Sequence, residues 1–152
     1  MPIESTLLAL RAKLHEHPEP AFHEMATREI LERFLSAAIE GKKGFHLFHA
    51  LETGIILEYR GATAPDEPFT LFRADMDALP LTEERGNPVV SRNPGFMHAC
   101  GHDGHTAMLL GAARYLSEHR DFDGTVVLIF QPAEEGEGGD VARDPPAHCR
   151  AG

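Results

Sequence analysis

Thr125-Val126-Val127-Leu128-Ile129-Phe130 is the stretch of this sequence that best defines the fold. Its β-branched and aromatic residues favour a strand, and no polar residue alternates with them. A continuous apolar run of this length indicates a strand that is buried on both faces, as in the sheets of α/β proteins. We therefore expect a layered α/β domain built around this strand.

The segments that precede this strand support the same fold class. Amphipathic helices are predicted over residues 4–17, 23–38 and 105–118. Further strands are predicted over residues 45–51, 54–59 and 69–73. The resulting order of helix, helix, three strands, helix and strand is typical of an α/β domain, and the sequence contains no internal repeat.

The composition is that of a globular protein without affinity for polyanions. The chain has 152 residues, of which 42% are hydrophobic and 25% charged, and its net charge is −10. This length suffices for one domain with a core, and the acidic balance argues against nucleic acid and anionic membranes as partners. No apolar run approaches the roughly 20 residues of a membrane span, and no signal peptide is evident. Two cysteines do not make a disulfide framework, so we expect a cytoplasmic protein.

The densest group of chemically reactive side chains lies in the sequence Met97-His98-Ala99-Cys100-Gly101-His102-Asp103-Gly104-His105. Cys100 and His102 suit a borderline-soft divalent cation, and Gly101 lets the backbone bend so that both can point at one ion. The alternative is a buried cysteine and a hydrogen-bonded histidine at a helix start, although so many polar groups beside glycines are unusual for a core. We expect His105 either to cap its helix or to hold Asp103 near the ligands.

Two adjacent carboxylates follow the apolar run, in Gln131-Pro132-Ala133-Glu134-Glu135-Gly136. Neighbouring side chains of a regular strand point to opposite faces, but Pro132 and Gly136 make this backbone irregular, so both carboxylates can approach one site. One of Glu134 and Glu135 would then bind a metal ion, and the other would take a proton from metal-bound water. The alternative is a solvated loop that carries two like charges.

Asp75 and Asp77 alternate at the end of a predicted strand, and residues two apart share a face. Both are therefore expected at the same crevice, where they would orient a histidine ligand or bind the metal themselves. A salt bridge to Arg73 is the alternative. Three further histidines, which lie beside two prolines and far from any cysteine, are interpreted as structural: His15, His17 and His23.

Four motifs, in order along the chain, resemble those of the N-acyl-amino-acid amidohydrolases. This family comprises the hippurate hydrolases, auxin-conjugate hydrolases and bacterial aminoacylases, a branch of the dinuclear metallopeptidases that includes carboxypeptidase G. The motifs are Arg11-x-x-Leu14-His15-x-His17-Pro18-Glu19, Arg73-Ala74-Asp75-Met76-Asp77-Ala78-Leu79-Pro80, Met97 to Ala107, and Phe130-Gln131-Pro132-Ala133-Glu134-Glu135-Gly136. The resemblance runs from about residue 7 to residue 139.

The resemblance implies a three-layer α/β/α catalytic domain of the phosphorylase/hydrolase-like type. It also implies two divalent metal ions, usually zinc, manganese, cobalt or nickel. Cys100, His102 and Glu135 would be metal ligands, Glu134 the general base, and Asp77 the carboxylate that supports a metal-binding histidine. The implied reaction is hydrolysis of a small N-acyl amino acid to a carboxylate and a free amino acid, and relatives are often homo-oligomers.

The sequence also departs from the family. Members are more than twice as long, insert a second domain for dimerisation and closure over substrate, and take two more histidine ligands from later in the chain. We therefore expect residues 1–139 to form only the N-terminal portion of the catalytic domain, with the second domain absent. In residues 140–152, Pro145-Pro146 precludes the amphipathic helix that should follow, so a disordered, aberrant tail of a truncated or frameshifted product is expected.

Two other functions remain open at this point. The chain is alternatively a non-catalytic remnant that binds metal weakly through Cys100, His102 and Glu135, because few ligands for two ions weaken affinity. A cysteine hydrolase that uses Cys100 with His102 or His105 is the third interpretation, although the sequence identifies no oxyanion donors for it.

Overall fold

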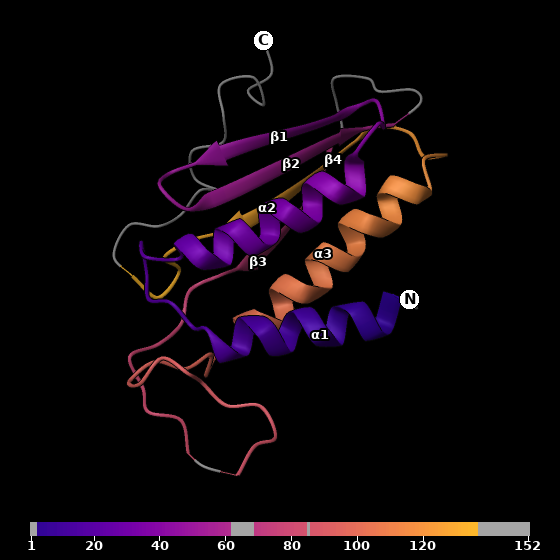
Figure 1. Ribbon diagram of the computed structural model, residues 1–152. Coiled ribbons are helices and arrows are strands. Elements are labelled where there is room, and N and C mark those ends of the chain that lie inside the picture. Colours follow the sequence, from indigo (N-terminus) through magenta and orange to yellow (C-terminus); the bar gives the residue numbers. More distant parts are fainter. Residues whose placement is uncertain (1–2, 62–68, 85, 137–152) are drawn as a thin grey trace.

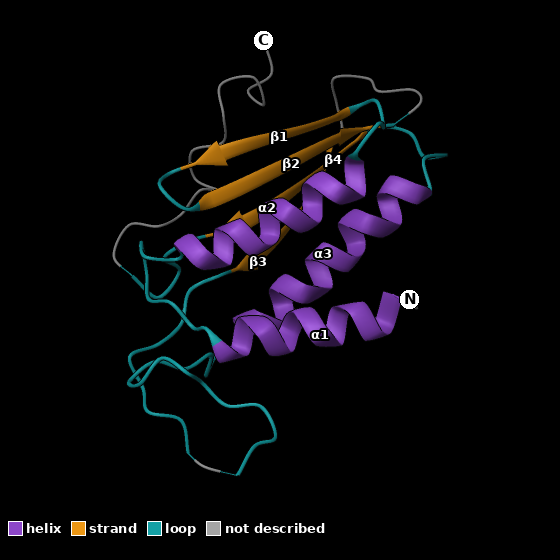
Figure 2. Cartoon of the chain, viewed as in Figure 1, coloured by secondary structure: helices purple, strands orange, loops and turns teal. Residues whose placement is uncertain are grey.

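The computed structural model describes residues 3–61, 69–84 and 86–136. Across these residues the elements follow the predicted order, as Figure 2 shows: α1 (Ile3–Glu16), α2 (Met25–Ile39), β1 (Phe45–Ala50), β2 (Gly54–Arg60), β3 (Phe69–Asp75), α3 (His102–Glu118) and β4 (Thr125–Gln131). The largest difference from prediction is in α3, which begins at His102 instead of residue 105. The predicted tail at residues 140–152 lies outside the described residues.

The strands form one mixed sheet, whose order within the described part of the chain is β1-β2-β4-β3. β1 and β2 form an antiparallel hairpin, and β2 also pairs antiparallel with β4. β3 and β4 are parallel, with Asp75 opposite Gln131, and α3 connects them. Because the carboxyl ends of parallel neighbours meet at one edge, the residues that follow β3 and β4 are brought together.

All three described helices pack on one face of this sheet (Figure 1). The main core joins alternate residues of the central strands to leucines of the helices, among them Leu14 of α1, Leu35 of α2 and Leu110 of α3. A smaller cluster on the opposite face contains Ile56, Val127 and Ile129. The α/β class is therefore confirmed, and β4 is buried on both faces as predicted. A second helical layer over the smaller cluster stays a prediction.

Local contacts explain how the helices begin and pack. The carboxylate of Glu19 accepts hydrogen bonds from the main-chain nitrogens of Ala26 and Thr27, at 3.1 and 2.8 Å, and so satisfies the free amides at the start of α2. α1 crosses α3 closely enough that a Cβ on Gly111 would lie 2.7 Å from a methyl carbon of Leu7. Glycine at this position therefore permits the α1–α3 contact, which sets the start of α3 beside the end of α1.

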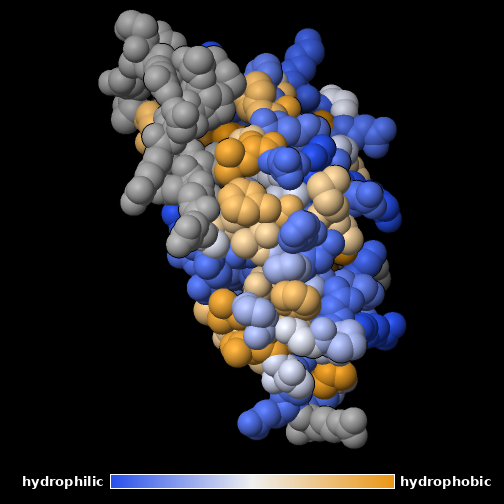
Figure 3. All heavy atoms as spheres, turned by 90° about the vertical axis from the view of Figure 1, so that its left-hand side faces the viewer, coloured by the Kyte–Doolittle hydropathy of each residue, from blue (hydrophilic) through white to orange (hydrophobic). Residues whose placement is uncertain are grey.

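The surface combines apolar and polar side chains. On the face shown in Figure 3, hydrophilic residues interrupt the hydrophobic surface. Several large apolar residues are exposed, and three of them lie on β3: Phe69, Leu71 and Phe72. In the described parts of the chain, the helices are too short or too polar to cross a membrane.

Candidate metal centre

The thiol of Cys100, the imidazole of His102 and the carboxylate of Glu135 lie at the sheet edge where β3 and β4 end. One donor atom from each of these side chains lies within 4.8 Å of the donor atoms of the other two. Cys100 is exposed, whereas His102 is buried at the first position of α3. Gly101 lies between them with a φ of +79°, a left-handed conformation that glycine adopts without a Cβ clash. The structure thus brings together the three residues for which the sequence predicts metal binding.

His102 contacts Asp77, the residue that is expected to support a metal-binding histidine. Its Nδ1 lies 2.9 Å from the main-chain oxygen of Asp77, and 3.3 Å from Oδ1 of the same residue. A carbonyl oxygen can only accept a hydrogen bond, so Nδ1 carries the proton and the neutral ring keeps its lone pair on Nε2. Although burial opposes ionisation of both groups, the hydrogen bond raises the pKa of His102 and lowers that of Asp77.

Asp77 also fixes the second carboxylate-bearing loop. Its Oδ2 accepts a hydrogen bond of 2.9 Å from the main-chain nitrogen of Glu135. One carboxylate, itself almost fully buried, therefore contacts both His102 and the backbone of Glu135. These contacts connect the loop after β3 to the loop after β4.

The thiol of Cys100 is hydrogen-bonded to the carboxylate of Glu135. Its Sγ donates to Oε1 of Glu135 at 2.7 Å. This hydrogen bond, together with burial and the negative charges of Glu135, Glu134 and Asp77, raises the pKa of Cys100 to about 11. Placing a thiolate beside these carboxylates requires a positive charge among them.

A second acidic group shares the same histidine. Donor atoms of Asp75, His102 and Glu134 also lie within 4.8 Å of one another. Arg73 Nε donates to Oδ1 of Asp75 at 2.8 Å, and Arg73 Nη2 lies 3.9 Å from Oε1 of Glu134. Asp75 therefore forms the salt bridge to Arg73 that is the alternative interpretation, while its proximity to His102 leaves a role at the metal site as a prediction. Glu134 and Glu135 approach one imidazole from the same loop, as the irregular sequence around them predicts.

The remaining histidines of the motif have other environments. His105 is exposed within the first turn of α3, with its ring centre 5.9 Å from that of His102, so the expectation that it caps the helix is wrong. Asp103 is held instead by His15, whose Nδ1 lies 2.9 Å from its Oδ2. His98 is buried, and this burial lowers its pKa to about 4.

Sequence reasoning misses Glu24, which contacts the loop that carries the two glutamates. Its carboxylate is fully buried and accepts a hydrogen bond of 2.8 Å from the main-chain nitrogen of Ala133. The predicted helix of residues 23–38 includes Glu24, whereas in the structure Glu24 lies directly before α2 and its side chain makes no capping hydrogen bond. No sequence signal points to Ala133, which is 109 positions away.

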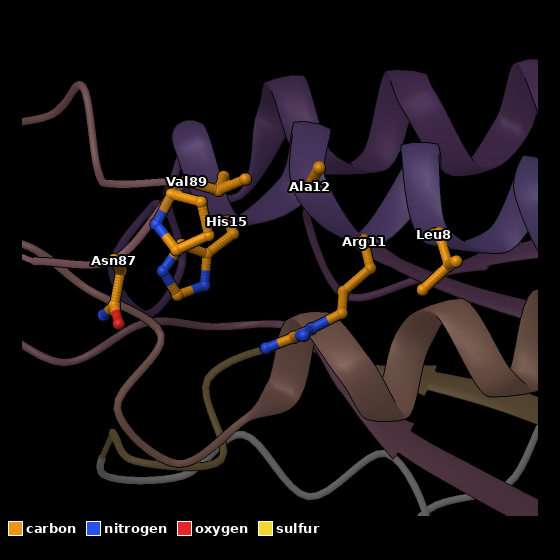
Figure 4. A pocket seen from close by; sticks show the side chains of 7 residues that line it. Leu8, Arg11, Ala12, His15, Asn87 and Val89 are labelled. Carbon is orange, nitrogen blue, oxygen red and sulfur yellow. The ribbon is translucent and has the colours of Figure 1, made fainter.

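A separate hollow of about 330 Å³ lies between α1 and the loop before α3 (Figure 4). It is lined by Leu8, Arg11, Ala12, His15, Asn87, Pro88 and Val89, and by none of the candidate metal ligands. Arg11 Nε donates to Oδ2 of Asp103 at 3.2 Å, and His15 Nε2 pairs with Glu83 at 3.0 Å. The cationic groups of this hollow are thus already paired with carboxylates.

Comparison with known proteins finds similarity to a family of peptidases and to amide hydrolases. The model of Peptidase family M20/M25/M40 matches residues 71–145, which include the loops after β3 and β4. The chain is 47% identical over 134 residues to IAA-amino acid hydrolase ILR1-like 2 of Arabidopsis thaliana. This alignment covers 88% of this chain and 29% of the relative. It is 44% identical to N-acetylcysteine deacetylase of Bacillus subtilis, over 85% of this chain and 33% of the relative.

Solved structures agree with the sequence comparison. The Bacillus subtilis YXEP protein, described as a dinuclear metal-binding peptidase, superposes with a TM-score of 0.81 at 40% identity, over 90% of this chain and 37% of that one. The aminopeptidase PepT of Bacillus cereus, at 15% identity and a TM-score of 0.64, shares the fold. This chain spans about a third of the length of the relatives that it matches. The chain is therefore similar to Peptidase family M20/M25/M40 over residues 71–145, the part that contains Asp77, Cys100, His102 and the two glutamates of the candidate site.

Proposed function

We propose that Cys100, His102 and Glu135 bind a divalent cation, in a site that hydrolyses the amide bond of N-acyl amino acids. The observation that carries this proposal is the convergence of a thiol, an imidazole and a carboxylate within 4.8 Å at the sheet edge. Sulfur, nitrogen and oxygen donors in this combination suit zinc, and also cobalt, nickel and manganese. The name of the Bacillus subtilis neighbour supports two cations in the complete site.

The donor set fits a cation in its details. The Nε2 lone pair of His102 is left for a ligand, because Nδ1 donates to the main-chain oxygen of Asp77. The short contact between Cys100 and Glu135 holds a single proton between two groups that both bind metals as anions. When bound, a divalent cation supplies Lewis-acid chemistry, which polarises an amide carbonyl and makes a water molecule more acidic.

Glu134 is the proposed general base. It lies beside His102 without occupying the position of Glu135, and Arg73 lies 3.9 Å from its Oε1. From there its carboxylate would take a proton from the attacking water and deliver it to the leaving amine. Asp77 would act through other groups, since it orients His102 and fixes the main chain of Glu135.

The substrate class follows from the relatives. One is named a hydrolase of IAA-amino acids and another a deacetylase of N-acetylcysteine, and both names describe an amide between an acyl group and an amino acid. A small N-acyl amino acid is therefore the proposed substrate. The net charge of −10 supports a small molecule over nucleic acid.

The geometry argues against a cysteine hydrolase. The nearest hydrogen-bond partner of Cys100 is the carboxylate of Glu135, which raises the pKa of the thiol to about 11 and keeps it protonated at neutral pH. A nucleophilic cysteine needs the opposite, namely a neighbouring base or cation that favours the thiolate.

The test measures bound metal and turnover on the same preparations. Wild-type protein is expected to bind cobalt or zinc and to release free amino acid from N-acetyl and N-benzoyl amino acids, with loss of turnover in a chelator. Glu134→Gln should keep the metal and lower kcat by about 10²–10⁴-fold, as for loss of a general base. Glu135→Gln and Cys100→Ser should bind the metal more weakly than wild type.

Each of the alternatives has its own outcome in this test. Metal binding without turnover in wild-type protein would show that this chain only binds the cation. Turnover that survives both the chelator and Cys100→Ser would overturn the proposed metal chemistry. Turnover that resists the chelator but is abolished by thiol alkylation would restore the cysteine hydrolase.

A further inference from the structure

We infer that Glu24 is a positioning residue of the metal centre: its buried carboxylate holds the left-handed turn at Ala133 from which Glu134 and Glu135 project. This inference rests on the proposed function, because it assigns a role toward the same site. Glu24 lies directly before α2 and far along the chain from the residues that it would position.

The turn at Ala133 adopts a backbone conformation that its side chain disfavours. Ala133 has a φ of +53°, in the left-handed region, and it is fully buried. Residues with a Cβ seldom adopt this conformation unless the surrounding structure holds them there. The departure from strand geometry occurs two residues after the end of β4 and directly before Glu134. It therefore sets the direction in which the two glutamates leave the sheet.

Glu24 supplies the contact that holds this turn. Its Oε1 accepts a hydrogen bond of 2.8 Å from the main-chain nitrogen of Ala133, and its Oε2 accepts one of 2.6 Å from Oγ1 of Thr53. Glu24, Thr53 and Ala133 are all fully buried. A buried carboxylate is retained only where such donors satisfy it, and both oxygens of Glu24 have one.

The side chain of Glu24 acts on the loop after β4 and not on its own helix, because α2 does not depend on it for capping. Glu19 accepts from the amides of Ala26 and Thr27, whereas the side chain of Glu24 makes no capping hydrogen bond. The carboxylate is directed away from its own helix, toward the loop after β4.

The two main-chain amides on either side of Glu134 are each bound by a buried carboxylate. Glu24 accepts from the nitrogen of Ala133, and Asp77 accepts from the nitrogen of Glu135. Asp77 also orients His102, so its contribution reaches both sides of the site. Within the site, the carboxylate of Glu24 bonds the loop after β4 alone among the contacts resolved for the described residues, and its other bond is to Thr53. Its loss should therefore disturb Glu134 and Glu135 while leaving Cys100 and His102 in place.

The experiment compares cobalt binding by wild-type protein, Glu24→Ala and Glu24→Gln. Glu24→Ala should weaken cobalt affinity by about tenfold or more, the usual effect of removing a group that orients a ligand. Its cobalt complex should keep the thiolate-to-cobalt charge-transfer band from Cys100, while the d–d bands change because Glu135 is displaced. Glu24→Gln should stay close to wild type, since its amide oxygen can accept from Ala133 and its amide nitrogen can donate to Thr53.

Two more variants separate positioning from general stability. Leu35→Ala removes a buried side chain from the same helix, so it should lower stability without changing cobalt affinity or spectrum. Ala133→Gly, added to Glu24→Ala, should restore part of the lost affinity, because glycine adopts the left-handed conformation without the Cβ clash. Equal affinity in wild type and Glu24→Ala, or an equal loss in Leu35→Ala, would overturn the inference.

A readout without metal keeps this inference separate from the proposed function. In metal-free protein, amide hydrogen exchange at Ala133, followed by NMR, should accelerate in Glu24→Ala and stay slow in Glu24→Gln. If wild-type protein binds no cobalt, the proposed function fails. The exchange rates then still decide whether Glu24 holds the turn, and unchanged exchange in Glu24→Ala would exclude that role.

Discussion

The imidazole of His15 and the carboxylate of Asp103 join the end of α1 to the start of α3 through a contact of 2.9 Å between Nδ1 and Oδ2. Asp103 is fully buried and directly follows His102 in the chain. The other ring nitrogen of His15 lies 3.0 Å from Oε1 of Glu83, in the loop before α3. One histidine therefore lies between two carboxylates from separate segments, and it supports the helix start that carries a proposed metal ligand.

The substitution His15→Gln should destabilise the protein, and the size of the loss should depend on pH. Burial opposes the charged form of His15, but hydrogen bonds with Glu83 and Asp103 outweigh it and raise the pKa above its ordinary value of 6.5. Hydrogen bonds with His15 and the amide of Ser91 lower the pKa of Glu83 to about 2. The charged pair of His15 and Glu83 therefore contributes its full stabilisation from about pH 4.5 to 6.5. In that window His15→Gln should lower the free energy of unfolding by about 1–3 kcal/mol.

The sign of this pH dependence is the sharper part of the prediction. A raised folded-state pKa contributes stability below pH 6.5 and loses it as the pH rises through the folded-state value, so the deficit of His15→Gln should shrink in alkaline solution. Urea unfolding of metal-free protein between pH 4.5 and 9 measures it. His17→Gln is the matched control, because that imidazole bonds only the main-chain oxygen of Lys13 among the contacts resolved for the described residues. A deficit that grows with pH would contradict the assignment.

Asparagine at position 77 should weaken metal binding without unfolding the protein. Its side chain keeps the size of aspartate and one oxygen that can accept from the amide of Glu135. It loses the negative charge that lies 3.3 Å from Nδ1 of His102. Asp77→Asn should therefore lower cobalt affinity by about 10- to 100-fold in a spectroscopic titration. Asp121→Asn changes an exposed carboxylate outside the site and should bind cobalt as wild type does.

The helices and strands can be predicted from the sequence because they depend on local residue patterns. The proximity of the site residues can be predicted because the ends of parallel neighbouring strands lie at one edge of a sheet. The apolar run from Thr125 to Phe130 has the composition of a buried strand, and β4 is that strand. The motifs after β3 and β4 meet because the two strands are parallel neighbours with Asp75 opposite Gln131. That Cys100, His102 and Glu135 are metal ligands stays a prediction.

What the sequence does not predict depends on long-range contacts and on uncommon backbone conformations. The left-handed turn at Ala133 has no glycine to mark it, and the carboxylate that holds it is 109 positions away. In the sequence, His15 lies near two prolines and 88 positions from Asp103, and only the fold brings the two side chains together. The early start of α3 likewise follows from the φ of +79° at Gly101, which a pattern of apolar residues does not indicate.

Metal binding should release protons, and most of them should come from Cys100. The hydrogen bond with Glu135, burial and nearby carboxylates raise the pKa of this thiol to about 11, so it is protonated at neutral pH and must lose its proton to bind metal as a thiolate. Cobalt affinity should therefore increase about tenfold per pH unit for each proton released. Calorimetry in buffers of different ionisation enthalpy counts these protons.

Cys100→Ser provides the comparison for this count. A serine hydroxyl keeps its proton when it binds a cation weakly, so the variant should release about one proton fewer than wild type. His102 adds a smaller release at acidic pH, because its hydrogen bond with Asp77 raises its pKa. Equal proton release by wild type and Cys100→Ser would show that the sulfur does not bind the metal.

The substitution Gly101→Ala should show whether the backbone conformation between Cys100 and His102 affects metal binding separately from its effect on stability. Gly101 and Gly95 have φ values of +79° and +85°, and an added Cβ would meet no atom within 4 Å at either position. Each substitution should therefore cost about 1–2 kcal/mol through backbone strain alone. Only Gly101 lies between two proposed ligands, so Gly101→Ala should also weaken cobalt affinity, whereas Gly95→Ala should leave it unchanged. Equal affinities for the two variants, measured beside their unfolding curves, would mean that the left-handed turn at Gly101 does not set the approach of Cys100 to His102.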